Sequence, residues 1–338
     1  MAKELPSPAQ WVVSRQSSVL ARSQALDLGL DKQTVRNRVR YGDWQRLQRG
    51  VYATFTGEPN REAQLWAALL RAGADATLSH YTAAERHGLL SKVSQSIHIM
   101  VPAIRNPERC GKIPGVVIHR SDSVLSTRHP AMAPPCTRIE DTVLDLIRIA
   151  GTFDAKFDWV CKAVGSQLTT PGRLLAALSQ RKRFPGRREV QLMCGYAAEG
   201  IMSWLELEWV IGVERPHGLP AARRQVRVRQ GSGNRYLDNL YEKYRVCVEL
   251  DGRAAHPESE QRRDNARDRW NLVHEKIVTM RFKVLDLYDQ PRKCVAAADL
   301  SSVLNDSVPH EYPTSEFPRV PVGYPCGAQC PVGRNQHG

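Results

Sequence analysis

Acidic residues interrupt two short apolar runs in the C-terminal half of the sequence, at residues 236–241 and 245–250. Such runs predict two strands joined by a tight turn, with alternate side chains on opposite faces. Alternation puts Leu237 and Tyr241 on one face of the first strand and Asp238 on the other. A folded core resists acidic side chains at such positions, so this stretch strongly constrains what the chain can form.

The second strand repeats the pattern, because Cys247, Glu249 and Asp251 share one face while apolar residues take the opposite face. Neighbouring carboxylates repel each other, and burying them without partners is costly unless a cation or shared protons compensate. We therefore expect Asp238, Glu249 and Asp251 to converge on a divalent metal ion. The alternative is a solvated strand edge from which the carboxylates point into water.

The residues that follow the second strand add further polar groups to the same edge. Gly252 ends the strand with a flexible backbone, and His256 follows within reach. The next segment, 259–275, is predicted to be a helix on which Arg263 and Arg267 lie one turn apart. These cations are placed to face a phosphate.

Together these motifs resemble the PD-(D/E)XK nuclease superfamily, in particular its very-short-patch-repair-like endonuclease domain. The resemblance implies a central sheet flanked by helices, with Glu206, Asp238 and Glu249 lining a Mg²⁺ (or Mn²⁺) site. The matching pieces are S-W-L-E at 203–206, Y-L-D at 236–238, V-E-L-D-G at 248–252, His256, R-x-x-x-R-D at 263–268 and M-R-F at 280–282.

One position departs from the superfamily pattern, since Asp251 stands where a lysine is usual two residues after Glu249. The repair-like subgroup also lacks this lysine. The general base is therefore left open between Asp251 and His256.

The resemblance also implies a mechanism of DNA phosphodiester hydrolysis. Asp238 and Glu249 are expected to ligate the metal, with Glu206 acting through a water molecule. Three arginines are expected to neutralise charge on the phosphate: Arg263, Arg267 and Arg281.

The N-terminal residues predict a second functional unit, with two helices at 17–29 and 31–41 followed by a short hairpin at 45–54. The second helix presents one polar, basic face that suits phosphates and base edges. The residues expected to contact DNA are Lys32, Gln33, Arg36, Asn37 and Arg40 on this helix and Arg46 and Arg49 on the hairpin.

The pattern G-L-x-x-x-T-V-R-N-R-V-x-x-G-x-W-Q-R-L-x-R-G-V-Y over 29–52 resembles the winged-helix domain of antitoxins from abortive-infection type IV toxin–antitoxin systems. The resemblance implies DNA binding and a cognate toxin protein as a partner. Two alternatives remain open: a protein-contact module with the same shape, and a basic face that is merely solvated.

Composition fits a nucleic-acid partner, because the 338 residues carry a formal net charge of +13. The start of the chain has no apolar run after a charged end, and no stretch of 18 apolar residues occurs. We therefore expect a cytoplasmic protein with no membrane partner. The eight cysteines show no C-x-x-C spacing and are expected to be reduced.

Several local expectations concern the region between these units. Residues 153–178 are expected to be helical, and residues 189–208 are expected to form a helix that carries Glu206 to the acidic site. On a helix over 138–149 the acidic residues are expected to face water: Glu140, Asp141 and Asp145. Three histidines lack metal-binding spacing and are expected to pack or face solvent: His80, His87 and His98.

These observations predict an α+β or α/β multidomain fold. The expected parts are a winged helix-turn-helix at 1–56, a middle α/β region at 57–180, a restriction-endonuclease-like sheet flanked by helices at 189–304 and a disordered tail at 305–338. The predicted function is a DNA-binding protein with a Mg²⁺-dependent endonuclease domain, in DNA repair or phage defence. The alternatives are a non-catalytic antitoxin-like regulator and a protein-interaction module in phage defence.

Overall fold

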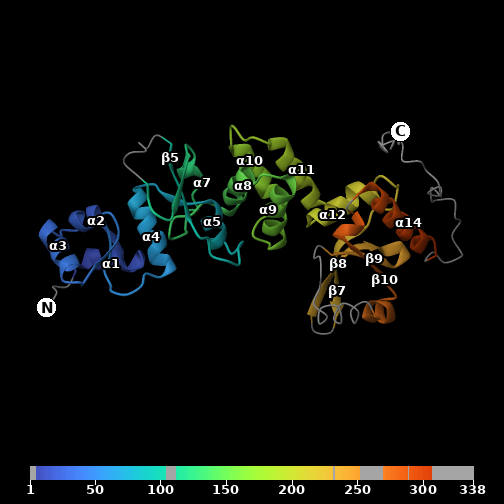
Figure 1. Ribbon diagram of the computed structural model, residues 1–338, viewed down its shortest axis with the longest axis horizontal. Coiled ribbons are helices and arrows are strands. Elements are labelled where there is room, and N and C mark those ends of the chain that lie inside the picture. Colours follow the sequence, from blue (N-terminus) through green and yellow to red (C-terminus); the bar gives the residue numbers. More distant parts are fainter. Residues whose placement is uncertain (1–4, 104–111, 231–232, 252–268, 288, 307–338) are drawn as a thin grey trace, which may run out of the picture. The chain divides into compact units, whose positions relative to one another are not determined.

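The computed structural model describes residues 5–103, 112–230, 233–251, 269–287 and 289–306 (Figure 1). It confirms the expected mixed architecture of helices and several small sheets, and the chain divides into two compact units, 1–197 and 198–338. Within the described ranges, no helix combines the length and the apolar character needed to cross a bilayer. Residues 307–338, most of the tail expected to be disordered, lie outside the described part.

The first unit begins with three helices and a three-stranded antiparallel sheet in the order β1-β3-β2. Asp31 caps helix α3 because its carboxylate accepts the backbone N–H of Thr34 at 2.7 Å. Val35 and Trp44 are buried in the small core beneath it. The elements are α1 (Ser7–Arg15), β1 (Val19–Ala21), α2 (Arg22–Asp27), α3 (Lys32–Arg40), β2 (Gln45–Gln48) and β3 (Val51–Ala53).

A second small sheet follows in the order β4-β5-β6, with β4 antiparallel and β6 parallel to the central β5. Helix α4 packs against it through Leu65 and Leu69, which share a core with Ile99 and Val101. The elements are α4 (Arg61–Ala72), β4 (Thr77–Leu78), α5 (His80–Arg86), β5 (Ile97–Pro102), β6 (Val116–Ser121) and α7 (Val124–Thr127).

Four helices complete this unit: α8 (Ile139–Ile149), α9 (Phe153–Gly165), α10 (Pro171–Gln180) and α11 (Arg187–Ala198). The expected helix over 153–178 is two helices, because Gln167 takes a positive φ and Thr170 caps a new helix that begins with proline.

The expectation that the acidic residues of α8 face water was wrong, because all three are buried. Arg181 supplies the charge that makes this burial possible, with its guanidinium 2.9 Å from Asp141 and 2.6 Å from Asp145. Glu140 is paired with Arg173 at 2.7 Å and accepts a hydrogen bond from Thr169.

The second unit is built on a four-stranded sheet in the order β10-β9-β8-β7 (Figure 1). Strand β8 is antiparallel to both neighbours, and β10 runs parallel to β9. The elements are α12 (Trp204–Trp209), η1 (Val210–Glu214), β7 (Arg223–Gln230), β8 (Gly233–Tyr241), η2 (Glu242–Tyr244), β9 (Val246–Asp251), η3 (Asn271–Glu275), β10 (Val278–Lys283), η4 (Val284–Leu287) and α14 (Gln290–Asp306).

Helices α12, η1 and α14 contribute to a core that covers one face of this sheet, where Trp209 lies against Phe282 with ring centroids 4.9 Å apart. Leu237 and Tyr241 do not share a face as simple alternation predicted. Tyr241 belongs to the core under the helices, whereas Leu237 joins Cys247 in a second cluster. Regular two-residue alternation therefore fails between these two positions of β8.

The expected helix over 189–208 is also interrupted. Helix α11 ends at Ala198, Gly200 takes a φ of +84°, and α12 begins after Ser203 as a separate element. A glycine tolerates this backbone conformation at little cost. Glu206 is thus positioned by a short helix of the second unit.

Candidate functional site

Glu206 lies in the first turn of α12 and is only 6% exposed. The turn is capped reciprocally, since the Glu206 N–H donates to Ser203 Oγ at 3.1 Å and Ser203 Oγ lies 3.2 Å from Glu206 Oε1. The Met202 N–H donates to the other carboxylate oxygen at 2.9 Å. Contacts within residues 202–206 therefore already position this carboxylate.

The side chain of Gln225, on β7, joins Glu206 to Asp238. Its Nε2 lies 3.4 Å from Glu206 Oε1 and 3.4 Å from Asp238 Oδ1. The second oxygen of Asp238 accepts the N–H of Leu250 at 3.3 Å, which anchors Asp238 to β9. Gln225 thus bridges two acidic residues from separate elements, Glu206 on α12 and Asp238 on β8.

The electrostatics of this pair are unfavourable to a second negative charge. The pKa of Glu206 is raised to about 7, because burial and the nearby Asp238 carboxylate outweigh the lowering effect of the Met202 N–H. A cation beside the two carboxylates would reverse the effect by favouring the ionised form. An all-oxygen donor set of this kind suits Mg²⁺ or Mn²⁺.

Glu249 lies on the adjacent strand but is engaged with a cation of the protein. Parallel pairing of β9 with β10 sets Glu249 beside Arg281, and Arg281 Nη1 lies 2.9 Å from Glu249 Oε2. Asp251 is half-buried at the last position of β9, in register with Lys283. The arginine predicted to contact phosphate therefore contacts one of the predicted metal ligands.

The predicted convergence of the carboxylates is not complete in this conformation. Across the described residues, the group of three potential ligands whose donor atoms all lie within 4.8 Å of one another consists of histidines, not carboxylates. Glu206 and Asp238 are brought together through Gln225, whereas Glu249 faces Arg281. The remaining predicted site residues lie outside the described residues: His256, Arg263 and Arg267.

A buried network next to the site was not anticipated from the sequence. Glu214, 3% exposed, pairs with Arg224 at 2.6 Å, and its other oxygen accepts the Tyr241 hydroxyl at 3.1 Å. Tyr241 in turn accepts the Trp209 indole N–H at 3.2 Å. The network ties η1 to β7 and β8. No spacing rule pairs Glu214 with Arg224, so the sequence offered no signal for it.

Five of the seven predicted DNA-contact residues of the first unit lie on α3, and two lie on the β2–β3 hairpin. Gln33 and Asn37 bond to each other at 2.9 Å, one turn apart. Arg38 is directed elsewhere, with its guanidinium 5.6 Å from the ring centroid of Trp44. The exposed predicted residues are Lys32, Gln33, Arg36 and Arg40 on α3, Arg46 on β2 and Arg49 in the β2–β3 turn, while Asn37 is half-buried.

Comparisons with known proteins add little to this geometry. No protein-family model matches the sequence, and no curated protein is significantly similar to it. A crystal structure of the RV2827C protein from Mycobacterium tuberculosis matches 57% of this chain and 78% of that chain, with 19% sequence identity and a TM-score of 0.37. A likeness at this level carries no argument about function.

Proposed function

We propose that the protein binds DNA and that its C-terminal unit is a nuclease-type domain that uses a divalent cation to hydrolyse DNA phosphodiester bonds. The observation that carries the proposal is the pair formed by Glu206 and Asp238. They come from different elements and meet through Gln225, and Glu206 is nearly buried without a cation among its contacts in the described part.

The order of elements supports the same proposal. A helix precedes three strands, a helical segment and a fourth strand, and the strands lie side by side in chain order within a sheet covered by helices. We propose that this sheet corresponds to the helix-flanked sheet that the nuclease resemblance implies. Fold alone does not establish chemistry, so the proposal depends on the acidic pair.

The carboxylates give the protein a set of oxygen ligands for Mg²⁺ or Mn²⁺. Asp238 and Glu249 would hold the ion, and Glu206 would contact it through water. When bound, the ion supplies Lewis acidity that lowers the pKa of a water molecule and stabilises charge on the phosphate. The charge of the ion would also favour the ionised form of Glu206, whose pKa is about 7 without it.

Arg281 has a definite part in this proposal. We propose that its ion pair with Glu249 opens when the carboxylate takes up a metal ion. Opening leaves the guanidinium at the same strand edge, where it would neutralise charge on the scissile phosphate. Substrate binding and metal binding are thereby linked.

The first unit supplies the DNA-binding part of the proposal. Three helices and an antiparallel sheet built from β1 and the β2–β3 hairpin support the proposal that this part is a winged helix. The exposed polar face of α3, with arginines on the hairpin, suits contacts with phosphates and base edges. We propose that α3 is the recognition helix.

Plasmid nicking in Mg²⁺ tests the hydrolytic proposal. Asp238→Ala and Glu249→Ala are each expected to lower the cleavage rate at least about 100-fold, because each removes a proposed ligand of the ion that would stabilise the transition state. Glu242→Ala, which removes an exposed carboxylate paired with Arg223, is the matched control and should cleave normally. Cleavage by both site variants at the wild-type rate rejects the site.

A second candidate function is a non-catalytic regulator that uses the sheet to hold DNA or a cognate toxin. The ion pair between Glu249 and Arg281 favours it, since a predicted metal ligand is already neutralised by the protein. This candidate predicts promoter binding without cleavage and without a need for Mg²⁺. Wild-type protein that binds its own promoter but never nicks DNA would establish it.

Both candidates require the α3 face, which a DNA-binding titration at several salt concentrations can test. Arg36→Ala with Arg40→Ala should weaken binding and reduce the salt dependence of log K by roughly one unit per lost phosphate contact. Arg215→Ala removes one exposed cation in the other unit and is the charge control. Unchanged affinity and salt dependence in the double variant would exclude α3 as the DNA-contacting helix.

A further inference from the structure

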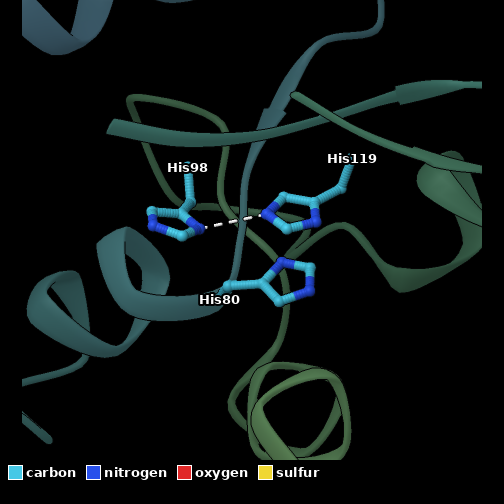
Figure 2. Close-up of side chains that lie close together, drawn as sticks. All are labelled: His80, His98 and His119. Carbon is cyan, nitrogen blue, oxygen red and sulfur yellow. Dashed lines mark hydrogen bonds between the residues drawn. The ribbon is translucent and has the colours of Figure 1, made fainter. Parts of the chain in front are cut away.

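Three histidines from different elements meet in the first unit, although their spacing in the sequence indicated no such group. His80 begins α5, His98 lies on β5 and His119 lies on β6 (Figure 2). Parallel pairing sets His98 opposite Val117, so His119, two residues further along, points to the same side of the sheet. One nitrogen from each ring lies within 4.8 Å of the other two.

The contacts between the rings are close. His98 Nδ1 lies 3.0 Å from His119 Nε2, as the dashed line in Figure 2 shows. The rings of His80 and His119 are stacked, with centroids 3.6 Å apart and planes inclined by 16°. Such packing of three polar rings is unusual for side chains that merely fill a core.

His80 is the member whose polar atoms are least satisfied. It is fully buried, its Nδ1 lies 3.0 Å from Ser79 Oγ, and its Nε2 has no hydrogen-bond partner in the part of the chain that the structure describes. A buried nitrogen without a partner is costly, and native structures retain few of them. In the tautomer whose Nδ1–H donates to Ser79 Oγ, the lone pair of Nε2 is available to a ligand.

We propose that His80, His98 and His119 bind a zinc ion that joins α5 to strands β5 and β6. Three imidazole nitrogens form a donor set typical of zinc. At Zn–N distances of 2.0–2.1 Å, tetrahedral geometry separates ligand nitrogens by about 3.3 Å. The His98–His119 nitrogens therefore need to move apart by only a few tenths of an ångström, whereas the stacked His80 ring must turn to direct its lone pair inward.

The protonation state of the cluster also suits a metal ion. Burial is the main cause that lowers the pKa of all three histidines, to about 3 for His80 and for His119, so the rings are neutral at physiological pH. Neutral imidazole is the form that ligates metals. When the ion replaces the His98–His119 hydrogen bond, the shared proton moves to the outer nitrogen of the ring that carries it, and both rings stay neutral.

Some neighbouring charged residues favour positive charge on the three histidines, and others oppose it. Asp145 on α8 favours positive charge at His119, and its buried Oδ2 has no hydrogen-bond partner within the described residues. Arg148 and Arg181 oppose positive charge at His80. Arg181 is itself paired with Asp141 and Asp145, which reduces its effect on the cluster.

Cobalt and zinc titrations of the full-length protein, stripped with chelator, test the proposal. We expect one Co²⁺ per chain with the intense visible absorption of a tetrahedral site, displacement by one Zn²⁺, and a rise in melting temperature with Zn²⁺. His98→Gln and His119→Gln, which change half-buried positions, should each weaken Zn²⁺ binding at least about 100-fold, since even outer-shell losses cost 10–100-fold. His274→Gln, an exposed histidine of the other unit, is the control.

Two results would overturn the proposal. One is the absence of stoichiometric Co²⁺ and Zn²⁺ uptake at micromolar metal. The other is uptake that His98→Gln and His119→Gln leave unchanged, which would assign the metal to other ligands such as cysteines. Circular dichroism of each variant separates loss of the site from loss of the fold.

Discussion

Two buried glutamates of the second unit, Glu206 and Glu214, have neighbours of opposite charge. Glu214 is neutralised by Arg224 and accepts two further hydrogen bonds, from the Tyr241 hydroxyl and the Ala222 N–H. Glu206 also accepts hydrogen bonds, but the charged group that acts on it is the carboxylate of Asp238. One glutamate has its counter-charge built into the fold, and the other has a raised pKa.

The contrast separates a structural role from a functional one. A buried carboxylate paired with arginine needs nothing more, as the Arg181 network in the first unit also illustrates. A buried carboxylate placed beside another carboxylate is a common feature of catalytic and metal-binding sites. We therefore assign Glu214 to the stability of the sheet and Glu206 to the proposed cation site.

Removing Glu214, the partner of the buried Arg224, should produce the largest change in folding stability. Glu214→Ala leaves the Arg224 guanidinium, 8% exposed, without its carboxylate and is expected to destabilise the protein by about 3–5 kcal/mol. Chemical denaturation measures this. Glu199→Ala removes a half-exposed partner of Arg215 and should cost no more than about 1 kcal/mol. Equal effects for the two variants would contradict the distinction.

The contribution of Glu206 to folding stability, in contrast, should depend on pH. Its folded pKa of about 7 lies above the ordinary value of 4.5, so the folded state binds more protons between these limits. The resulting stability is fully present below about pH 4.5 and is lost as the pH rises through 7.

Glu206→Gln removes the ionisable group and keeps the shape. In chelator, the variant should be more stable than the wild type above pH 7, by on the order of 2 kcal/mol, and the difference should vanish below about pH 4.5. Denaturation curves across this range measure it. A variant that is equally destabilised at every pH would show that Glu206 is a structural residue like Glu214.

A cation introduced between Glu206 and Asp238 should give Glu206 the counter-charge that Glu214 already has in Arg224. Gln225→Lys would place an ammonium group where the amide now bridges Glu206 and Asp238. We expect a gain of about 1 kcal/mol at pH 8 in chelator, because the position is half-exposed to solvent screening, together with loss of divalent-ion binding. Gln225→Met, which cannot supply charge, is the control. Unchanged ion binding in the lysine variant would place the cation elsewhere.

The parts of the proposed acidic site that the sequence indicated depend on local patterns. Ser203 and Glu206 form a capping pair readable over three residues, and Asp238 and Glu249 interrupt recognisable strands. Gln225 could not be predicted, since its bridging role arises only when β7 packs beside β8. The break in alternation between Leu237 and Tyr241 likewise depends on how the strands pack.

Tertiary pairing explains the other failures. The acidic residues of α8 were predicted to face water. Arg181, which neutralises two of them, is distant in sequence and could not be paired with them from local patterns. The histidine cluster was missed for the same reason, because α5, β5 and β6 bring His80, His98 and His119 together only in the folded sheet. Sequence spacing indicates ligands that lie on the same helix or strand. It does not indicate histidines that only the tertiary fold brings together.

Calorimetric titration of the full-length protein with Mn²⁺ tests the central claim most directly. We predict uptake of one Mn²⁺ that Asp238→Ala abolishes and that His98→Gln leaves intact, because the hard ion prefers the carboxylate oxygens to the histidine nitrogens. Absence of Mn²⁺ uptake, or uptake that survives Asp238→Ala, would contradict the assignment of Glu206 and Asp238 to a cation site.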